Sequence, residues 1–275
     1  MIDDEAAFKR RVTELYDGVA QSFGQIGPPT FQHAGRRLVA LAGVNPGARV
    51  LDVATGRGAV LLPAGERVGA RGRALGVDLA PGMVRETSAE TRRRGLHNVH
   101  LAIMDAEHLG LANSSFDFVL CSFAVHLFPR LEGALREFRR VLRPDGVLGI
   151  AAGGRMDPRW DWYRDLVRRH AAPEHASGVS QRSSRSLDEV TALLPAAGFS
   201  GVRETVEDVE FAYADEDEWW AALWTHGTRL PLESMTPEVL ERFRRDARLH
   251  LREVAAAGGL TCRIQFSFLL AAARP

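Results

Sequence analysis

Three aspartates stand where predicted strands end in the first half of the chain. Asp52 lies in the strand that runs into the turn Gly56-Arg57-Gly58, Asp78 ends the next strand, and Asp105 follows the third. Because glycine has no Cβ atom, such a turn lets a ligand approach the backbone closely. A carboxylate suits a different group at each place: an ammonium at Asp52, directly or through water, two ribose hydroxyls at Asp78, and an adenine amine at Asp105.

Each of these signals has an ordinary structural explanation when it is taken alone. An isolated Gly-x-Gly is often a plain strand–helix turn, and an aspartate after a strand often caps the next helix. At successive ends of parallel strands, however, the three aspartates share one edge, and open α/β sheets bind ligands at that edge. We therefore expect Asp52, Asp78 and Asp105 to hold an adenosyl amino acid together.

Hydrophobic periodicity predicts the elements that must position these residues. Strands are predicted at 49–53, 74–77, 99–103, 116–121, 147–151, 202–212 and 262–272. Helices are predicted at 5–24, 31–43, from Pro81 onwards, 130–142, within 155–182, at 186–197 (where Ser186 and Glu189 form a capping box) and over most of 215–259. The strand–helix alternation predicts an α/β fold with a parallel sheet, and the last two strands predict an antiparallel edge pair that carries a helical cap.

Composition excludes several classes of protein. The 275 residues carry 35 basic and 35 acidic side chains, and Lys9 is the single lysine, so we expect no nucleic-acid partner. No segment has the roughly 20 apolar residues of a membrane span, and the acidic start is unlike a secretory leader, so we expect a cytoplasmic protein without a membrane partner. Cys121 and Cys262 lack metal-site spacing, and Pro173 breaks the group His170, Glu174 and His175, so we expect no metal.

Five segments carry a family resemblance: VLDVATGRGA from Val50, GVDLAPGMV from Gly76, MDAEHL from Met104, SSFDFVLCSFAVHLFP from Ser114 and RRVLRPDGVLGIA from Arg139. Together they resemble the class I methyltransferases that use S-adenosylmethionine (SAM). Within these they are most similar to the ubiquinone/menaquinone-biosynthesis-type branch, which includes many small-molecule methyltransferases. The resemblance covers residues 45–152 well and is loose elsewhere.

This resemblance implies a Rossmann-like, seven-stranded, mostly parallel sheet with an antiparallel last strand and a helical cap. It also implies a set of contacts to SAM. The methionine and ribose end of SAM would contact Asp52, Ala54, Gly56 and Gly58, and the ribose would also contact Asp78. The adenine would contact Leu79, Met83, Asp105 and Ala106. The methionine part would also contact Ser122 and Phe123. Ala54 stands where many members have glycine, and Arg57 where a small residue is usual.

The implied organisation has five parts. Residues 1–44 form a helical lid, 45–152 the SAM-binding core, 153–213 a helix, a loop and strands that complete the sheet, 214–259 a substrate cap and 260–275 the final strand. A nicotinamide-binding Rossmann domain is the nearest competitor. It normally has a third glycine at the position of Leu61, and it gives no reason for Asp52 or for Asp105-Ala106.

The methyl group of SAM is already electrophilic, so the protein must mainly align the acceptor and exclude water. His126, in the loop after the fourth strand, is our candidate base, with a structural or helix-capping role as the alternative. Tyr16 is a weaker candidate that equally suits a half-buried core position. For the substrate pocket we propose His33, Trp160, Tyr163, Trp220 and Trp224, although aromatic residues at helical spacing more often face a core.

The sequence therefore predicts methyl transfer from SAM to an O, N or C atom of a small organic metabolite of secondary metabolism, by in-line displacement. S-adenosylhomocysteine would be the second product, and the protein would be a monomer or homodimer. Two alternatives stay open. One is an enzyme of the same fold that cyclises or rearranges its substrate without net methyl transfer, and the other is a non-catalytic binding module.

Overall fold

The computed structural model describes residues 2–171 and 187–274, so the predictions on Glu174, His175 and Ser186 lie outside the described residues. The described strands form one seven-stranded sheet in the order β3-β2-β1-β4-β5-β7-β6. Their bounds are β1 (Arg49–Val53), β2 (Arg73–Asp78), β3 (Val99–Ile103), β4 (Phe116–Ser122), β5 (Leu142–Met156), β6 (Phe199–Ala212) and β7 (Thr261–Ala273). Strands β1 to β5 pair in parallel, whereas β7 is antiparallel to both β5 and β6. The predicted sheet is confirmed.

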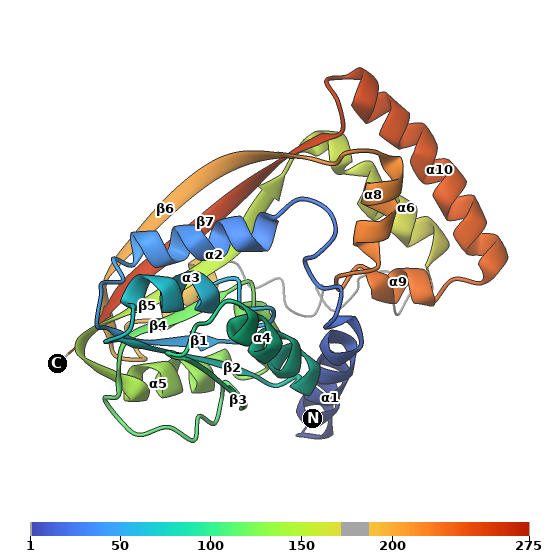
Figure 1. The fold of residues 1–275 in the computed structure, drawn as a ribbon. Helices are drawn as coiled ribbons and strands as arrows, with labels where there is room; N and C mark the ends of the chain where they lie inside the picture. The colour runs from blue at the N-terminus through green and yellow to red at the C-terminus, as the bar shows by residue number, and fades with distance from the viewer. Residues whose placement is uncertain (1, 172–186, 275) are drawn as a thin grey trace.

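Helices cover both faces of this sheet (Figure 1). The described helices are α1 (Ile2–Val19), α2 (Thr30–Leu41), α3 (Leu61–Val68), α4 (Pro81–Arg93), α5 (Leu131–Val141), α6 (Trp162–His170), α7 (Leu187–Leu193), α8 (Glu216–Leu223), α9 (Arg229–Glu233) and α10 (Pro237–Ala256). Short 3-10 turns lie at Val125–Leu127 and Pro158–Trp160. Helices α2 and α3 pack on one face and α5 and α7 on the other, so the sheet is buried on both sides.

Strand β1 shows how this burial sorts side chains. Val50 contributes to the core under α2 and α3, while Leu51 and Val53 contribute to the core over α5. Side chains alternate between the faces of a strand, so Asp52 lies on the same face as Val50. This placement decides what Asp52 contacts.

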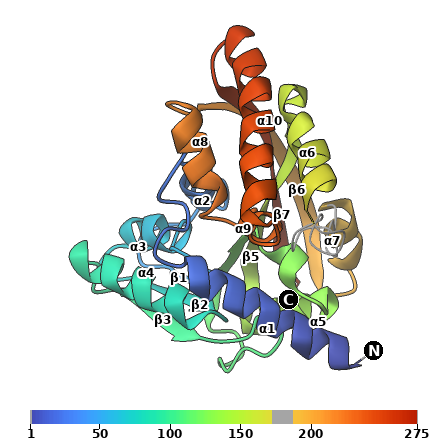
Figure 2. The same cartoon turned by 90° about the vertical axis from the view of Figure 1, so that its right-hand side faces the viewer.

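A cap of helices α6, α8, α9 and α10 stands at the far end of the long strands β6 and β7, with α10 beside α6 (Figures 1 and 2). It has a hydrophobic core of its own, which includes Phe243, Ala247 and Leu251 from one stripe of α10. Helix α6 belongs to the segment 153–213, which the sequence assigned to completing the sheet, yet it packs in this cap.

Two boundaries differ from the sequence prediction. Helix α1 ends at Val19 rather than at residue 24, because the chain passes into consecutive turns after Val19, and Gly24 then has a left-handed φ of 64°. Strand β5 begins at Leu142 rather than at residue 147, because Leu142 already pairs with Phe116 before the register shifts. Within the described ranges 2–171 and 187–274, no helix has the length and apolar character that a membrane span needs.

Candidate functional site

A cavity of about 650 Å³ opens at the carboxyl ends of strands β1 to β4. Most of the residues that the sequence assigned to the cofactor line it. They are Ala54, Gly56, Gly58, Asp78, Leu79, Met83, Asp105, Ala106, Ser122 and Phe123, together with the candidate catalytic residues Tyr16 and His126. These side chains come from separate strand ends, and the parallel pairing of the strands brings them to one edge.

The turn after β1 has the backbone of a ligand-binding loop. Gly56 and Gly58 have positive φ angles of 50° and 76°, and a Cβ atom added at Gly56 would meet no other atom within 4 Å. Ala54 has a φ of 54°, in the left-handed region where a glycine is favoured. Alanine therefore occupies a strained position here, and strain of this kind concentrates at binding sites.

Asp78 holds this turn against the next strand. Its two carboxylate oxygens accept hydrogen bonds from the backbone N–H groups of Gly56 (2.8 Å) and Ala80 (2.9 Å). Burial raises the pKa of Asp78, and the backbone hydrogen bonds oppose that rise. Because each carboxylate oxygen accepts more than one hydrogen bond, Asp78 retains capacity for two hydroxyl groups in the cavity.

Asp105 belongs to a charge cluster that links β3 to helix α1. Lys9 donates from its ammonium to Asp105 and Glu107, 2.7 Å from each, and Arg130 pairs with Glu107 at 3.1 Å. Burial would raise the pKa of Asp105, but the hydrogen bonds from Lys9 and from the N–H of Glu107 outweigh it, and the pKa lies below its usual value.

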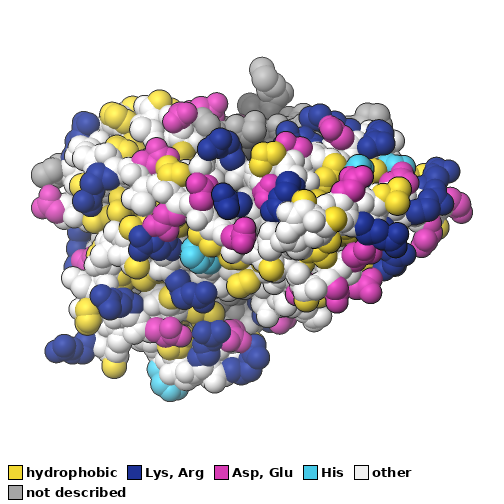
Figure 3. Space-filling view, turned by 90° about the horizontal axis from the view of Figure 1, so that it is seen from above, with side chains coloured by type: hydrophobic (Ala, Val, Ile, Leu, Met, Phe, Trp, Pro, Cys, Tyr) yellow, Lys and Arg dark blue, Asp and Glu magenta, His cyan; other side chains and the backbone are white. Residues whose placement is uncertain are grey.

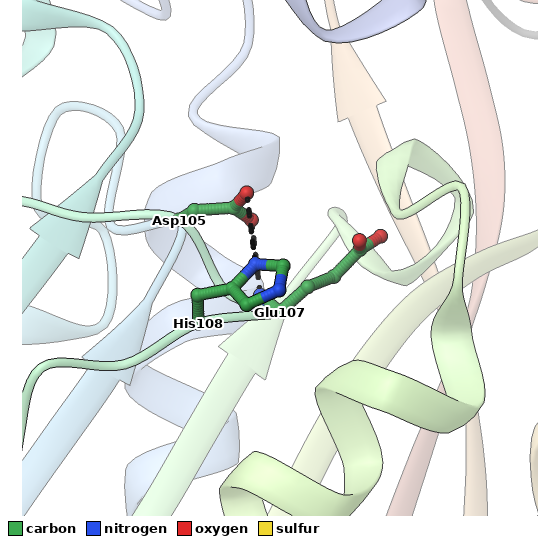
Figure 4. Close-up of side chains that lie close together, drawn as sticks. All are labelled: Asp105, Glu107 and His108. Carbon is green, nitrogen blue, oxygen red and sulfur yellow. Dashed lines mark hydrogen bonds and ion pairs between the residues drawn. The ribbon is translucent and has the colours of Figure 1, made fainter. Parts of the chain in front are cut away.

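Figure 4 shows the carboxylate of Asp105 directed at the ring of His108, 3.6 Å away, while the carboxylate of Glu107 points elsewhere. One ligand atom from each of these three residues lies within 4.8 Å of the others, which is close enough for a metal ion. Lys9 and Arg130 already pair with these two carboxylates, however, and Asp105 faces the cavity. The cluster therefore fits an ion-pair network better than a metal centre.

Asp52 is not among the residues that line the cavity, although the sequence predicted that it contacts the ligand's ammonium, directly or through water. Its side chain turns toward helix α3, where it accepts hydrogen bonds from the Thr55 hydroxyl (2.6 Å) and from the backbone N–H of Leu61. Burial raises its pKa to about 7, and these hydrogen bonds oppose the rise. The physical reason is the alternation of strand β1, which sends Asp52 to the helix face. A water-mediated contact between Asp52 and the ammonium group of SAM stays a prediction.

The residues proposed for the substrate pocket lie elsewhere. Trp160, Tyr163, Trp220 and Trp224 belong to the hydrophobic core of the cap, and none lines the cavity. His33 is also outside the cavity wall, with its ring between those of Phe211 and Phe266. The large rings are more stabilising between cap helices than in an open pocket, because their apolar area is removed from water there.

A different set of rings lines the cavity. Phe31 lies at the centre, with ring centroids 5.0 Å from Phe23, 5.2 Å from Phe123 and 5.4 Å from His226. The sequence prediction missed Phe23, Phe31 and His226. The two phenylalanines flank the break at Gly27-Pro28-Pro29, where the chain passes from α1 to α2 along the cavity.

Helix α1 closes over the cofactor end of the cavity through polar contacts. Arg57 donates to the backbone carbonyls of Ala20 and Gln21, at the end of that helix. Asp17 accepts a hydrogen bond from the backbone N–H of Gly82, in the first turn of α4. Arg57, which departs from the family pattern, therefore holds the lid to the glycine turn.

The two histidines and the tyrosine that line the cavity are neutral near pH 7. Burial lowers the pKa of His126, and burial also lowers that of His226, where a bond to the Ala222 carbonyl opposes it. Burial and the charge of Asp78 raise the pKa of Tyr16 to about 12. Tyr16 is therefore a proton donor rather than a base, while both histidines are able to accept a proton.

Charged side chains of both signs are interspersed on the face of the molecule in Figure 3, which therefore carries no extended patch of one sign. This agrees with the balance of 35 basic and 35 acidic residues.

Comparison with known proteins gives the same picture. Residues 50–146 match the family described as "Methyltransferase domain". Nocamycin O-methyltransferase of Saccharothrix syringae is 33% identical over 95% of this chain and 98% of that protein. Aklanonic acid methyltransferase DauC of Streptomyces sp. (strain C5) is 40% identical over 54% of this chain and 67% of that protein. The YcgJ protein from Bacillus subtilis, with a TM-score of 0.59 and 22% identity over 88% of this chain and 99% of that chain, shares the fold.

The residues of the cavity fit SAM. The paired acceptors of Asp78 suit ribose hydroxyls, Leu79 and Met83 offer apolar contacts, and the open backbone at Gly56 admits a ligand. The assignment to the quinone-biosynthesis branch and the role of each residue stay predictions. The near full-length match to a named methyltransferase, the matched domain and the fold together show that this chain belongs to the class I SAM-dependent methyltransferases.

Proposed function

We propose that this methyltransferase transfers the methyl group of SAM to an oxygen atom of a small, ring-containing organic metabolite. One observation carries the proposal: the same cavity is lined by the carboxylates of Asp78 and Asp105 and by the contacting rings of Phe23, Phe31 and Phe123, which we assign as its polar end and its aromatic end. The polar end suits the adenosyl part of the cofactor, and aromatic faces suit a flat apolar acceptor.

The relatives support oxygen as the methylated atom. The nocamycin enzyme is named an O-methyltransferase, and the DauC protein is named for an acid as its substrate. Both names describe small organic molecules, and the volume of about 650 Å³ lies in the range of small-molecule sites. We therefore expect a hydroxyl or carboxyl oxygen on a compound of secondary metabolism.

The protein's own contribution is binding, alignment and removal of water, because SAM supplies an already electrophilic methyl group. Lys9, Asp17 and Arg57 keep helix α1 over the polar end. The aromatic rings exclude water from the acceptor. A hydroxyl acceptor must also lose its proton, and the prediction of His126 as the base stays open, because it lines the cavity and is neutral near pH 7.

The direct test uses SAM labelled in its methyl group and a panel of naphthols and aromatic carboxylic acids. We expect S-adenosylhomocysteine to form in step with a product that carries the label on oxygen. A converted acceptor without S-adenosylhomocysteine would instead support a cyclisation or rearrangement. If the label appeared on nitrogen or carbon, the proposed atom would be wrong.

The acceptor site is tested by Phe31→Ala. Loss of the central ring should raise KM for the acceptor about tenfold, the effect of roughly 1–2 kcal/mol of lost contact, while the Kd for SAM stays within about twofold. Phe211→Ala is the matched control, because Phe211 joins the same aromatic neighbourhood through Phe266, whose ring contacts Phe123, but does not line the cavity. Equal effects of both changes would count against the aromatic acceptor site.

A further inference from the structure

The cap reaches the cavity through one residue pair. Of the described residues that follow Phe128, those that line the cavity are His226 and Gly227, directly after helix α8. The rest of the wall comes from the first half of the chain. The described part of the chain after Phe128 therefore places one titratable side chain in the cavity wall, and that side chain is His226.

The hydrogen bonds of His226 fix its tautomer. Its Nδ1 atom lies 2.9 Å from the carbonyl oxygen of Ala222 and 2.9 Å from the hydroxyl oxygen of Thr225. A carbonyl oxygen only accepts, and the Thr225 hydroxyl donates its proton to the same carbonyl at 2.8 Å. Nδ1 therefore carries the proton, and Nε2 holds a lone pair that no described residue engages.

Two aromatic rings fix the plane of the imidazole. Phe23 meets it edge-on at 5.4 Å between ring centroids, and Phe31 lies against it at 5.4 Å. Phe31 also contacts Phe123, the residue after Ser122 at the end of β4, so His226 stands one ring away from the predicted methionine end. Burial lowers the pKa of His226, so the ring stays neutral near pH 7.

We infer that His226 is the catalytic base that takes the proton of the acceptor hydroxyl on Nε2; this inference rests on the proposed function. The acceptor O–H bond breaks and an Nε2–H bond forms. The oxygen gains the methyl group as the sulfur–carbon bond of SAM breaks, which leaves S-adenosylhomocysteine and a protonated His226. The Ala222 carbonyl orients the ring and stabilises this cation, as a third group does in other nucleophile–base pairs.

His126 is less well prepared for the same task. It lines the cavity, but none of the residues at 2–171 and 187–274 makes a hydrogen bond to its ring, so neither its tautomer nor its orientation is set. If His226 only capped the carboxyl end of helix α8, the bond from its Nδ1 to the Ala222 carbonyl would be sufficient. That role does not account for the place of the His226 ring in the cavity wall between Phe23 and Phe31.

The first experiment measures binding with two matched probes in the presence of S-adenosylhomocysteine. 2-Naphthol has a hydroxyl proton to donate, and its methyl ether, 2-methoxynaphthalene, has none. The native protein should bind the naphthol about tenfold more tightly, as one hydrogen bond contributes. His226→Phe, which keeps an aromatic ring, should abolish this preference, while His126→Phe should preserve it.

Direct observation of the ring completes the binding test. The protein is labelled with nitrogen-15 in its histidines and studied by NMR, and the signal that disappears in His226→Phe is assigned to His226. This signal should show a neutral ring protonated on Nδ1. Addition of 2-naphthol should shift the Nε2 resonance of the same ring. A preference for the naphthol that survives in His226→Phe, no preference in the native protein, or a ring protonated on Nε2 would each overturn the inference.

A second variant separates hydrogen bonding from proton transfer. His226→Gln retains an acceptor but takes up no proton, so it should restore naphthol binding and still lower kcat at least about 100-fold. Turnover as fast as in the native protein would exclude His226 as the base. Failure of the proposed function looks different: the naphthol preference would depend on His226, but no acceptor would yield S-adenosylhomocysteine.

Discussion

The ammonium nitrogen of Lys9 lies 2.7 Å from a carboxylate oxygen of Asp105 and 2.7 Å from one of Glu107. The single lysine of the chain thus joins the N-terminal helix to the strand edge that lines the cavity. The Glu107 side chain is 1% exposed, so its charge depends on protein partners rather than on water.

Lys9→Met should lower the free energy of unfolding at pH 7 by about 1–3 kcal/mol, because a buried carboxylate loses one of its cations. The pKa of Asp105 is depressed in the folded protein, so its share of this stability is present above its unfolded pKa and is lost as the pH falls through its folded pKa. Urea titrations should therefore show the native protein and Lys9→Met converging as the pH falls below about 4, the ordinary pKa of an aspartate. Lys9→Arg, which keeps the charge, is the control. A difference that is independent of pH would contradict the ion-pair explanation.

Gly82→Ala should push helix α1 away from α4. The added Cβ atom would lie 2.6 Å from the Asp17 carboxylate oxygen and 3.0 Å from the Cβ of Ala20. We expect a loss of about 1–3 kcal/mol of stability and faster proteolysis within residues 2–27. Gly18→Ala is the control within α1, because its Cβ meets no atom within 4 Å and alanine favours a helix by about 0.5–1 kcal/mol. Unchanged proteolysis in Gly82→Ala would mean that this contact does not hold the helix.

Asp78→Asn should weaken SAM binding by about 1–3 kcal/mol, since one charged acceptor becomes a donor that faces backbone N–H groups. Isothermal titration calorimetry measures the change, and circular dichroism verifies the fold. Asp208→Asn, at an exposed position of β6, should leave the affinity unchanged. An affinity of Asp78→Asn within twofold of the native value would remove Asp78 from the ribose site.

Asp52 should make the ligand-free protein less stable as the pH rises from about 4 to about 7. Burial raises its folded pKa to about 7, so in this window the folded state holds a proton that the unfolded state has released. Each pH unit then costs up to about 1.4 kcal/mol. Asp52→Asn keeps an acceptor for Thr55 and removes the titration. Its stability relative to the native protein, measured by urea unfolding, should increase with pH over this window, and a constant difference would contradict the raised pKa.

Local pattern in the sequence was sufficient for the fold and for part of the site. The apolar runs of β1 to β5 and the glycine turn specify a parallel sheet, because fully buried strands require continuous apolar sequence and the connecting turns require particular backbone angles. The position of Asp78 and Asp105 at the cavity follows from that pattern alone, since the ends of parallel strands share one edge.

Tertiary structure decided which side chains meet. Phe31 and His226 are far apart in the sequence, and their contact depends on how the cap packs against the sheet, which no local periodicity encodes. The same packing buried Trp160 and Trp220 in the cap, although their spacing fitted a pocket equally well. Asp52 was read correctly as a strand residue, but only the pleat of β1 against α3 determined that its carboxylate faces the helix and not the cavity.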